Sequence, residues 1–358
     1  MTSRGRGQLS GLVAAVLFGC SAPLISTLIG SGSALSIAGL LYAGAALALL
    51  SIRLLKGLAR DETPVQLRDA PSLAGLILLG GIVGPIALVL GLARLPAASS
   101  SLLLNLETVF TLAIAVLVGR EHLGKRGAAA AALTITGAIV LSDGSLGGAN
   151  ATGVALIALA TLAWGIDNNL SQRLSLRDPI QIATIKAAGA ALPMLALALL
   201  LRQALPVLPA ALALLCIGAL GYGISIWLDL LALRHLGAAR EAVLFSTAPF
   251  VGALFAVVVL RTPLSSPVLC AAALMAAGVA LLLRERHSHW HRHEALHHDH
   301  RHRHDPRHGD PHHEHAHAPE DLAGVAADQP FWHAHEHRHE PMAHEHPHVS
   351  DSHHRHGH

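Results

Sequence analysis

Charged residues are scarce in this sequence. Asp, Glu, Lys and Arg together make up 13% of the 358 residues, whereas hydrophobic residues make up 52%. A typical soluble domain carries about 25% charged residues. A single water-soluble domain could not bury so many apolar residues behind so few charged ones. We infer that lipid solvates much of the chain.

Cysteine and phosphate-binding motifs are also nearly missing. The three cysteines, Cys20, Cys216 and Cys270, each lie within an apolar run. We interpret them as small hydrophobic residues that are buried, and not as a disulfide framework. No glycine-rich loop has the Walker spacing, which argues against direct use of ATP. The pattern offers no catalytic residue, and we predict that the chain is not an enzyme.

Long apolar runs fill residues 1–286. A membrane-spanning helix needs about 20 mostly apolar residues. The first run meets that length, so we predict a retained helix and no cleavable signal peptide. We predict an all-α integral membrane fold of ten transmembrane helices. Their ranges are 9–29, 34–52, 72–92, 97–118, 127–143, 151–172, 180–201, 207–230, 240–260 and 266–283.

Basic residues between these spans indicate the orientation. Cytoplasmic loops are enriched in Lys and Arg. With the N-terminus inside, fifteen Lys and Arg residues fall on the inner side and only Arg94, Arg202 and Arg261 on the outer side. The sequence therefore predicts a multi-pass protein of the inner (plasma) membrane, with the N-terminus and the C-terminal tail in the cytoplasm.

The chain repeats itself at a shift of 141 residues. Residues 94–98 read Arg-Leu-Pro-Ala-Ala, and residues 235–239 read His-Leu-Gly-Ala-Ala. Each half has five spans, an odd number, so the second half would lie inverted relative to the first, as is typical of secondary transporters. Chance similarity between two stretches rich in Ala and Leu is the alternative. The predicted domains are 8–144, 150–285 and a tail, 287–358.

One run in each half resembles a known family. Residues 102–111, followed by Gly-Arg-Glu-His-Leu at 119–123, resemble the fourth helix and next loop of EamA-type members of the drug/metabolite transporter superfamily. Residues 233–250 resemble its inverted counterpart. The resemblance covers about residues 8–285 and implies ten helices, two EamA repeats and movement of a small solute. Many members carry a glutamate after the second-half helix, where this chain has Arg261-Thr262, so no role for that acid is expected here.

Ionisable groups inside a span cost about 2.5–3.5 kcal/mol and are functional candidates. Glu107 lies near the middle of the fourth predicted span. A low-dielectric environment favours the neutral form of a carboxyl group, so Glu107 is the predicted proton carrier, and Asn105 is assigned to the same pathway. A structural carboxyl group, hydrogen-bonded to Asn105, Thr108 or a neighbouring helix, is the alternative.

The sixth predicted span contains three consecutive polar residues, Asp167, Asn168 and Asn169. Three polar neighbours cannot all face lipid, so we predict that they line a cavity and contact solute. Lys186 lies as far after the turn near 175–177 as Asp167 lies before it, which makes an ion pair geometrically reasonable. Lys186 would then balance charge, or face Glu107 instead. A satisfied interhelical network is the alternative.

The tail has a different composition from the rest of the chain. It holds 25 of the 27 histidines and repeats at a shift of 46 residues. We predict that it is disordered without a ligand and binds Zn, Ni, Co or Cu weakly at several places. A polycation that responds to pH or a neutral repeat expansion are the alternatives. The predicted ligands are His291, His293, His298, His300, His302, His337, His339, His344, His346 and His348.

The leading hypothesis is a secondary transporter, a proton-coupled exporter of a small metabolite or drug-like solute, whose tail senses or buffers metal. It requires no cofactor. The partners are the lipid bilayer, the solute, protons and a transition metal, without nucleic acid, and the chain works as a monomer or homodimer. A transition-metal exporter is the second hypothesis, although the spans contain no His and no Cys pair. A membrane-anchored metal sensor is the remote one.

Overall fold

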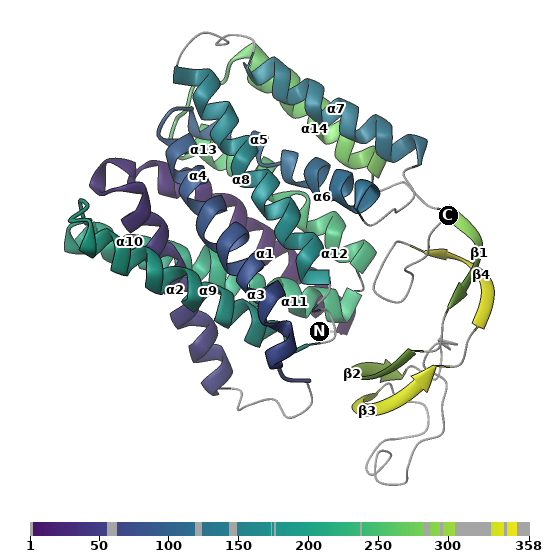
Figure 1. Cartoon of the computed structure of the whole chain (residues 1–358). Helices are drawn as coiled ribbons and strands as arrows, with labels where there is room; N and C mark the ends of the chain where they lie inside the picture. The colour runs from purple at the N-terminus through teal and green to yellow at the C-terminus, as the bar shows by residue number, and fades with distance from the viewer. Residues whose placement is uncertain are drawn as a thin grey trace.

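The structure is a computed structural model in which a bundle of helices is followed by four strands (Figure 1). It describes residues 3–55, 63–118, 124–142, 149–172, 174, 177–236, 238–282, 287–293, 296–304, 331–339 and 342–348. Leu and Ala dominate the helices, and both are strong helix formers. In lipid, a helix also satisfies every backbone polar group within its own segment.

Four long helices are continuous, and they open each half of the chain. They are α1 (Ser3–Ser26), α2 (Ala34–Leu55), α8 (Ala149–Gln172) and α9 (Pro179–Leu200). A short turn of helix, η1 (Ile29–Ser31), separates the first two. Two further continuous helices, α7 (Lys125–Ser142) and α14 (Ser266–Leu282), close the halves and lie side by side (Figure 1).

The third and eighth predicted spans each contain a π-helical segment. The third consists of η2 (Leu67–Asp69), α3 (Ala70–Gly75), η3 (Leu76–Val83) and α4 (Gly84–Leu92). The eighth consists of α10 (Leu208–Gly218), η4 (Ala219–Ile224) and α11 (Ser225–Leu236). The π-helical turns occur at positions that correspond in the sequence repeat. The Gly84 N–H donates to Leu79 O, and 141 residues later the Ser225 N–H donates to Leu220 O.

The fourth and ninth predicted spans are each broken near the middle. The fourth consists of α5 (Ala97–Leu103) and α6 (Leu106–Leu117), and the ninth of α12 (Ala238–Phe245) and α13 (Ala248–Val258). The breaks leave backbone groups outside the regular helical pattern. In transporters such irregular backbone lines a cavity or is buried in protein.

Eight helical stretches among the described residues are long and apolar enough to cross a membrane, and α14 is a shorter apolar helix. These nine coincide with nine of the ten predicted spans. The remaining prediction corresponds to α7, which begins with Lys125 and Arg126. α14 has 17 residues and extends about 25 Å, which is somewhat less than the hydrocarbon core of about 30 Å. The count of ten crossings and the boundaries of the two halves stay predictions.

Helices of one predicted half pack on helices of the other. α1 packs on α11 and α13, whereas α8 packs on α4 and α6. α2 packs along α9, and α7 along α14. The polar residues of α8 are therefore placed against the broken fourth span.

Hydrogen bonds and an ion pair join α2 and α9 at both ends. At one end, Arg53 Nη2 lies 3.9 Å from Asp178 Oδ2, while Asp178 Oδ1 also caps α9 by accepting hydrogen bonds from the backbone of Ile180 and Gln181. At the other end, the backbone carbonyl of Ala204 accepts hydrogen bonds from the backbone N–H of Ser33 at 2.9 Å. It also accepts one from the hydroxyl of Ser36 at 2.8 Å.

The cysteines differ from their prediction. They form no disulfide, but Cys216 and Cys270 are exposed on the bundle. In a membrane protein the outer surface contacts lipid tails and is itself apolar. An apolar run therefore does not imply burial within the protein.

Strands occur in the tail, where the sequence predicts disorder. They are β1 (His287–His293), β2 (Leu296–His304), β3 (Phe331–His339) and β4 (Met342–His348). β1 pairs antiparallel with β4, and β2 with β3. Histidine alternates with other residues at a period of two, which is the period of a strand. The prediction of disorder considered composition and the lack of apolar periodicity, and not the alternation of histidine. The side chains of these strands lie outside the described residues.

Candidate functional site

Two oppositely charged side chains meet inside the bundle. Lys186 Nζ of α9 lies 2.5 Å from Asp167 Oδ2 of α8. Asp167 is only 5% exposed. This is the ion pair that the equal spacing from the turn made reasonable. A buried carboxylate that lost its cation would be strongly destabilising, so the two residues depend on each other.

A backbone carbonyl of the π-helical segment lies next to this pair. Gly80 O has no donor in its own helix, because the Gly84 N–H bonds to Leu79 O and the next residue is Pro85, which has no N–H. The hydroxyl of Tyr42 donates to it at 2.7 Å, and the indole Nε1 of Trp164 donates to it at 3.1 Å.

Gly80 is also required sterically at this position. A Cβ at residue 80 would overlap the carboxylate of Asp167. From the sequence, Gly80, Gly81 and Gly84-Pro85 are interpreted as packing and hinge positions. The sequence did not indicate Tyr42 and Trp164, because the free carbonyl appears only once the helix widens.

The second polar contact joins α6 to α8. The side-chain amide of Asn168 donates to Glu107 Oε1 at 2.9 Å and to Thr111 Oγ1 at 3.3 Å. Glu107 is half-buried, and Asn168 is exposed. Neither has its hydrogen-bonding capacity exhausted by these contacts, since a carboxylate offers about four acceptor positions. Glu107 can therefore still take up a proton, and both side chains can form further hydrogen bonds.

The two remaining candidate amides, Asn169 and Asn105, have structural partners and do not contact Glu107. Asn169 donates to Thr111 O at 3.1 Å and to Gly165 O at 2.8 Å, so its amide holds α8 against α6. Asn105 is buried at the break between α5 and α6, where it donates to Leu102 O at 2.9 Å. The structure thus brings together Glu107 with Asn168, but not with Asn105.

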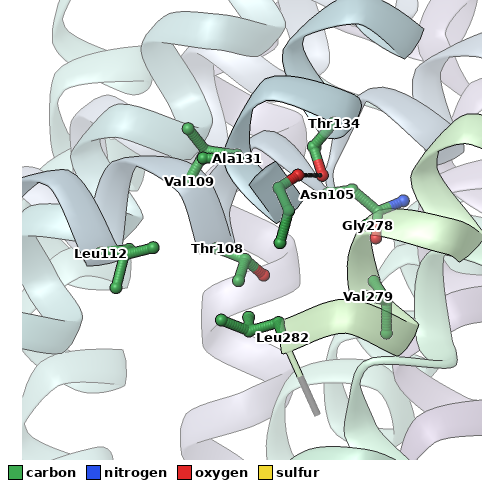
Figure 2. A pocket seen from close by; sticks show the side chains of 10 residues that line it. Asn105, Thr108, Val109, Leu112, Ala131, Thr134, Gly278, Val279 and Leu282 are labelled. Atoms are coloured by element: carbon green, nitrogen blue, oxygen red, sulfur yellow. Dashed lines mark hydrogen bonds between the residues drawn. The ribbon is translucent and has the colours of Figure 1, made fainter. Parts of the chain in front are cut away.

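Asn105 belongs to a small pocket on another side of α6 (Figure 2). The pocket lies between α6, α7 and α14, and its lining is mostly aliphatic. Asn105, Thr108 and Thr134 supply its polar groups, and the Thr134 hydroxyl donates to Ala130 O at 3.0 Å. With no charged side chain in its lining, this pocket suits an apolar group and not the proton chemistry of Glu107.

A further acid pair lies between α11 and α12. The sequence suggests that Asp229 lies near Arg234 as a surface or gating pair. In the structure Asp229 of α11 lies close to Glu241 of α12, and its Oδ1 atom is buried without a hydrogen-bond partner among the described residues. The side chain of Arg234 lies outside the described residues. The sequence could not reveal this pair, because twelve residues and a turn separate the two acids.

Comparison with known proteins decides the family. The model of the EamA-like transporter family matches residues 5–143 and again residues 151–284. The chain belongs to the EamA-like transporter family. An uncharacterized transporter from Methanothermobacter thermautotrophicus is 29% identical over 296 residues, which cover 77% of this chain and 85% of the relative. A solved crystal structure superposes with a TM-score of 0.59 at 21% identity, covering 78% of this chain and 99% of its own, which supports the fold.

Membership of the EamA-like family makes this chain a multi-pass membrane transporter rather than an enzyme. The lipid bilayer and a small solute are its expected partners. The family motif predicted at 119–123, including His122, lies outside the described residues. Among the residues whose side chains are described, no three His, Cys, Asp or Glu lie close enough to hold a metal ion.

Proposed function

We propose that this EamA-like transporter exports a small solute from the cytoplasm in exchange for protons across the plasma membrane. The observation that carries the proposal is the contact of Glu107 with Asn168 between α6 and α8. This contact supports the proposal, because it joins a titratable group of one predicted half to the other half, and an inverted-repeat transporter binds its solute between its halves. Glu107 would carry the proton, Asn168 would contact the solute, and Lys186 would balance Asp167.

The charge balance of this site favours a cation. Glu107 and Asp167 each bring a negative charge and Lys186 a positive one, so one negative charge is left over when Glu107 is ionised. A cationic or amine-bearing solute would compensate Glu107, and so would a proton. Competition between the two for one carboxylate would couple proton and solute if the unloaded transporter does not change its access side, because binding of either one favours release of the other.

The test uses protein reconstituted into liposomes with an acidic interior. We expect such liposomes to take up the cationic dye ethidium when diluted into neutral medium, with protons leaving at the same time. Zwitterionic leucine and neutral uridine serve as comparison solutes. Uptake of leucine or uridine but not ethidium would contradict the preference for cations. Uptake that is independent of the pH gradient would contradict proton coupling.

We also propose that the histidine-rich tail binds a transition metal and modulates transport from the cytoplasmic side. Neutral imidazole is a good ligand for Zn, Ni, Co and Cu. The inward orientation rests on the excess of basic residues in the predicted inner loops. A metal exporter is less well supported, because the contacts of Glu107 and Asp167 include no His or Cys.

Cellular metal content separates these two roles. We expect cells that produce the full chain, or a version ending at Arg286, to hold the same total Zn, Ni and Co as cells with an empty vector. If the full chain lowered one metal, and Glu107→Gln abolished that effect, the metal itself would be the solute. The same cells assayed for metal tolerance provide an independent readout.

A further inference from the structure

The pairing of the tail strands places histidine opposite histidine. In both sheets the numbers of paired residues add up to 635, as in His289 with His346 and His300 with His335. Six positions pair two histidines across the strands. They are His287 with His348, His289 with His346, His291 with His344, His298 with His337, His300 with His335, and His302 with His333.

The three pairs of each sheet share one face of that sheet. Successive residues of a strand belong to opposite faces, so every second residue returns to the same face. Between the histidine pairs lie mixed positions, such as Trp290 opposite Glu345 and Asp299 opposite Glu336. A slip of one residue would set histidines opposite these other residues. A slip of two residues would restore histidine opposite histidine, for example His289 opposite His348.

The spacing of these positions fits a metal ion. Directly opposite residues of an antiparallel pair have Cβ atoms about 4.5–5.5 Å apart. The next pair on the same face lies about 7 Å along the strands. Two neighbouring pairs therefore place four histidine positions on one face of the sheet. Four nitrogen ligands at about 2.0–2.1 Å complete a tetrahedral zinc site.

We propose that the paired tail strands form metal sites in which two neighbouring histidine pairs bind one divalent transition-metal ion, as Zn²⁺ or Co²⁺. The proposal deepens the metal-binding role of the tail given under the proposed function. It replaces a loose collection of ligands by a set defined by strand register. The set includes His287, His289, His333 and His335, and it omits His293 and His339, which pair with Met342 and Leu296.

Such sites would also join two distant parts of the tail. β1 and β2 lie directly after the last helix, whereas β3 and β4 lie more than 25 residues further along the sequence. An ion bound across the strands would hold these parts together. Bound metal would then stabilise the pairing of β1 with β4 and of β2 with β3. Removal of the metal would weaken both pairings.

The test compares two variants of the full-length protein, each lacking six histidines. The first variant removes one strand's share of every pair. It carries His→Gln at His287, His289, His291, His298, His300 and His302. The matched control removes the same number outside the strands. It carries His→Gln at His308, His312, His313, His315, His317 and His353.

The readout is the visible absorption of bound Co²⁺, together with Zn²⁺ affinity from competition with a chromophoric chelator. Metal geometry is diagnostic of the ligand set, and tetrahedral Co²⁺ absorbs far more strongly than octahedral Co²⁺. We expect strong absorption in the wild type and the control. In the strand variant we expect loss of this absorption and Zn²⁺ binding weaker by about tenfold or more.

Equal losses in both variants would overturn the proposal, because binding would then depend on histidine number alone. Strong absorption retained in the strand variant would overturn it as well. Neither measurement involves transport. A protein that exchanges no protons would leave this result unchanged, and a tail without paired sites would leave ethidium exchange unaffected.

Discussion

Replacing Lys186 with Met is expected to lower the free energy of unfolding by about 3–5 kcal/mol. The substitution keeps most of the side-chain volume but leaves Asp167, which is 5% exposed, without its cation. Removing one partner of a buried pair is costly, since the remaining charge stays desolvated. Thermal unfolding of the purified protein in detergent, at a fixed detergent concentration, measures the effect.

A second substitution separates the charge from the packing. Asp167→Asn added to Lys186→Met removes both charges, and we expect it to restore most of the lost stability. Lys125→Met, at an exposed position of α7, is the matched control and should change stability by less than about 0.5 kcal/mol. If the double variant were less stable than Lys186→Met alone, Asp167 would be stabilised by something other than Lys186.

Glu107→Gln is expected to abolish the coupling of ethidium uptake to the pH gradient. The amide keeps the size of the side chain and can still bond to Asn168, but it cannot bind a proton. In the wild type, Glu107 loses its proton at higher pH and becomes negatively charged, so binding of a cation should strengthen as pH rises. In the variant, binding should be weak and independent of pH. Ethidium fluorescence in reconstituted liposomes and equilibrium binding at several pH values measure both effects.

Thr108→Val is the matched control for Glu107→Gln. Thr108 is the next residue of α6, but it lines the pocket of Figure 2 and not the contact with Asn168. We expect this variant to keep the proton-coupled uptake of the wild type. Coupling that survived in Glu107→Gln would assign the proton to another carboxyl group, and the neighbouring acids Asp229 and Glu241 would be the next ones to test.

The sequence predicted the partners that simple helical geometry brings together. Asp167 and Lys186 are equally distant from a turn, and their ion pair follows from that spacing. Glu107 stood out because a charge within an apolar run is costly. The position of a residue around its helix was harder to predict. Asn105 is only two residues from Glu107, yet it lines the aliphatic pocket between α6, α7 and α14 and not the contact with Asn168. The break between α5 and α6, at which Asn105 lies, is not visible in composition.

Features that depend on irregular backbone could not be predicted. The widening of η3 leaves Gly80 O without a helical donor, and only then do Tyr42 and Trp164 become its partners. The apolar periodicity of the third span gives no sign of this change. The π-helical segments and the breaks nevertheless recur in corresponding places of the two predicted halves. Backbone irregularity therefore preserves the repeat where side-chain identity has largely diverged.

The bonds at both ends of α2 and α9 restrict how this transporter can move. Arg53 with Asp178 joins one pair of ends, and Ser33 and Ser36 with Ala204 O join the other. Two helices that are bonded to each other at both ends are expected to move as one rigid body. Opening towards either side of the membrane would then depend on the interrupted helices. Their breaks and π-helical segments would act as hinges about which the half-helices rotate.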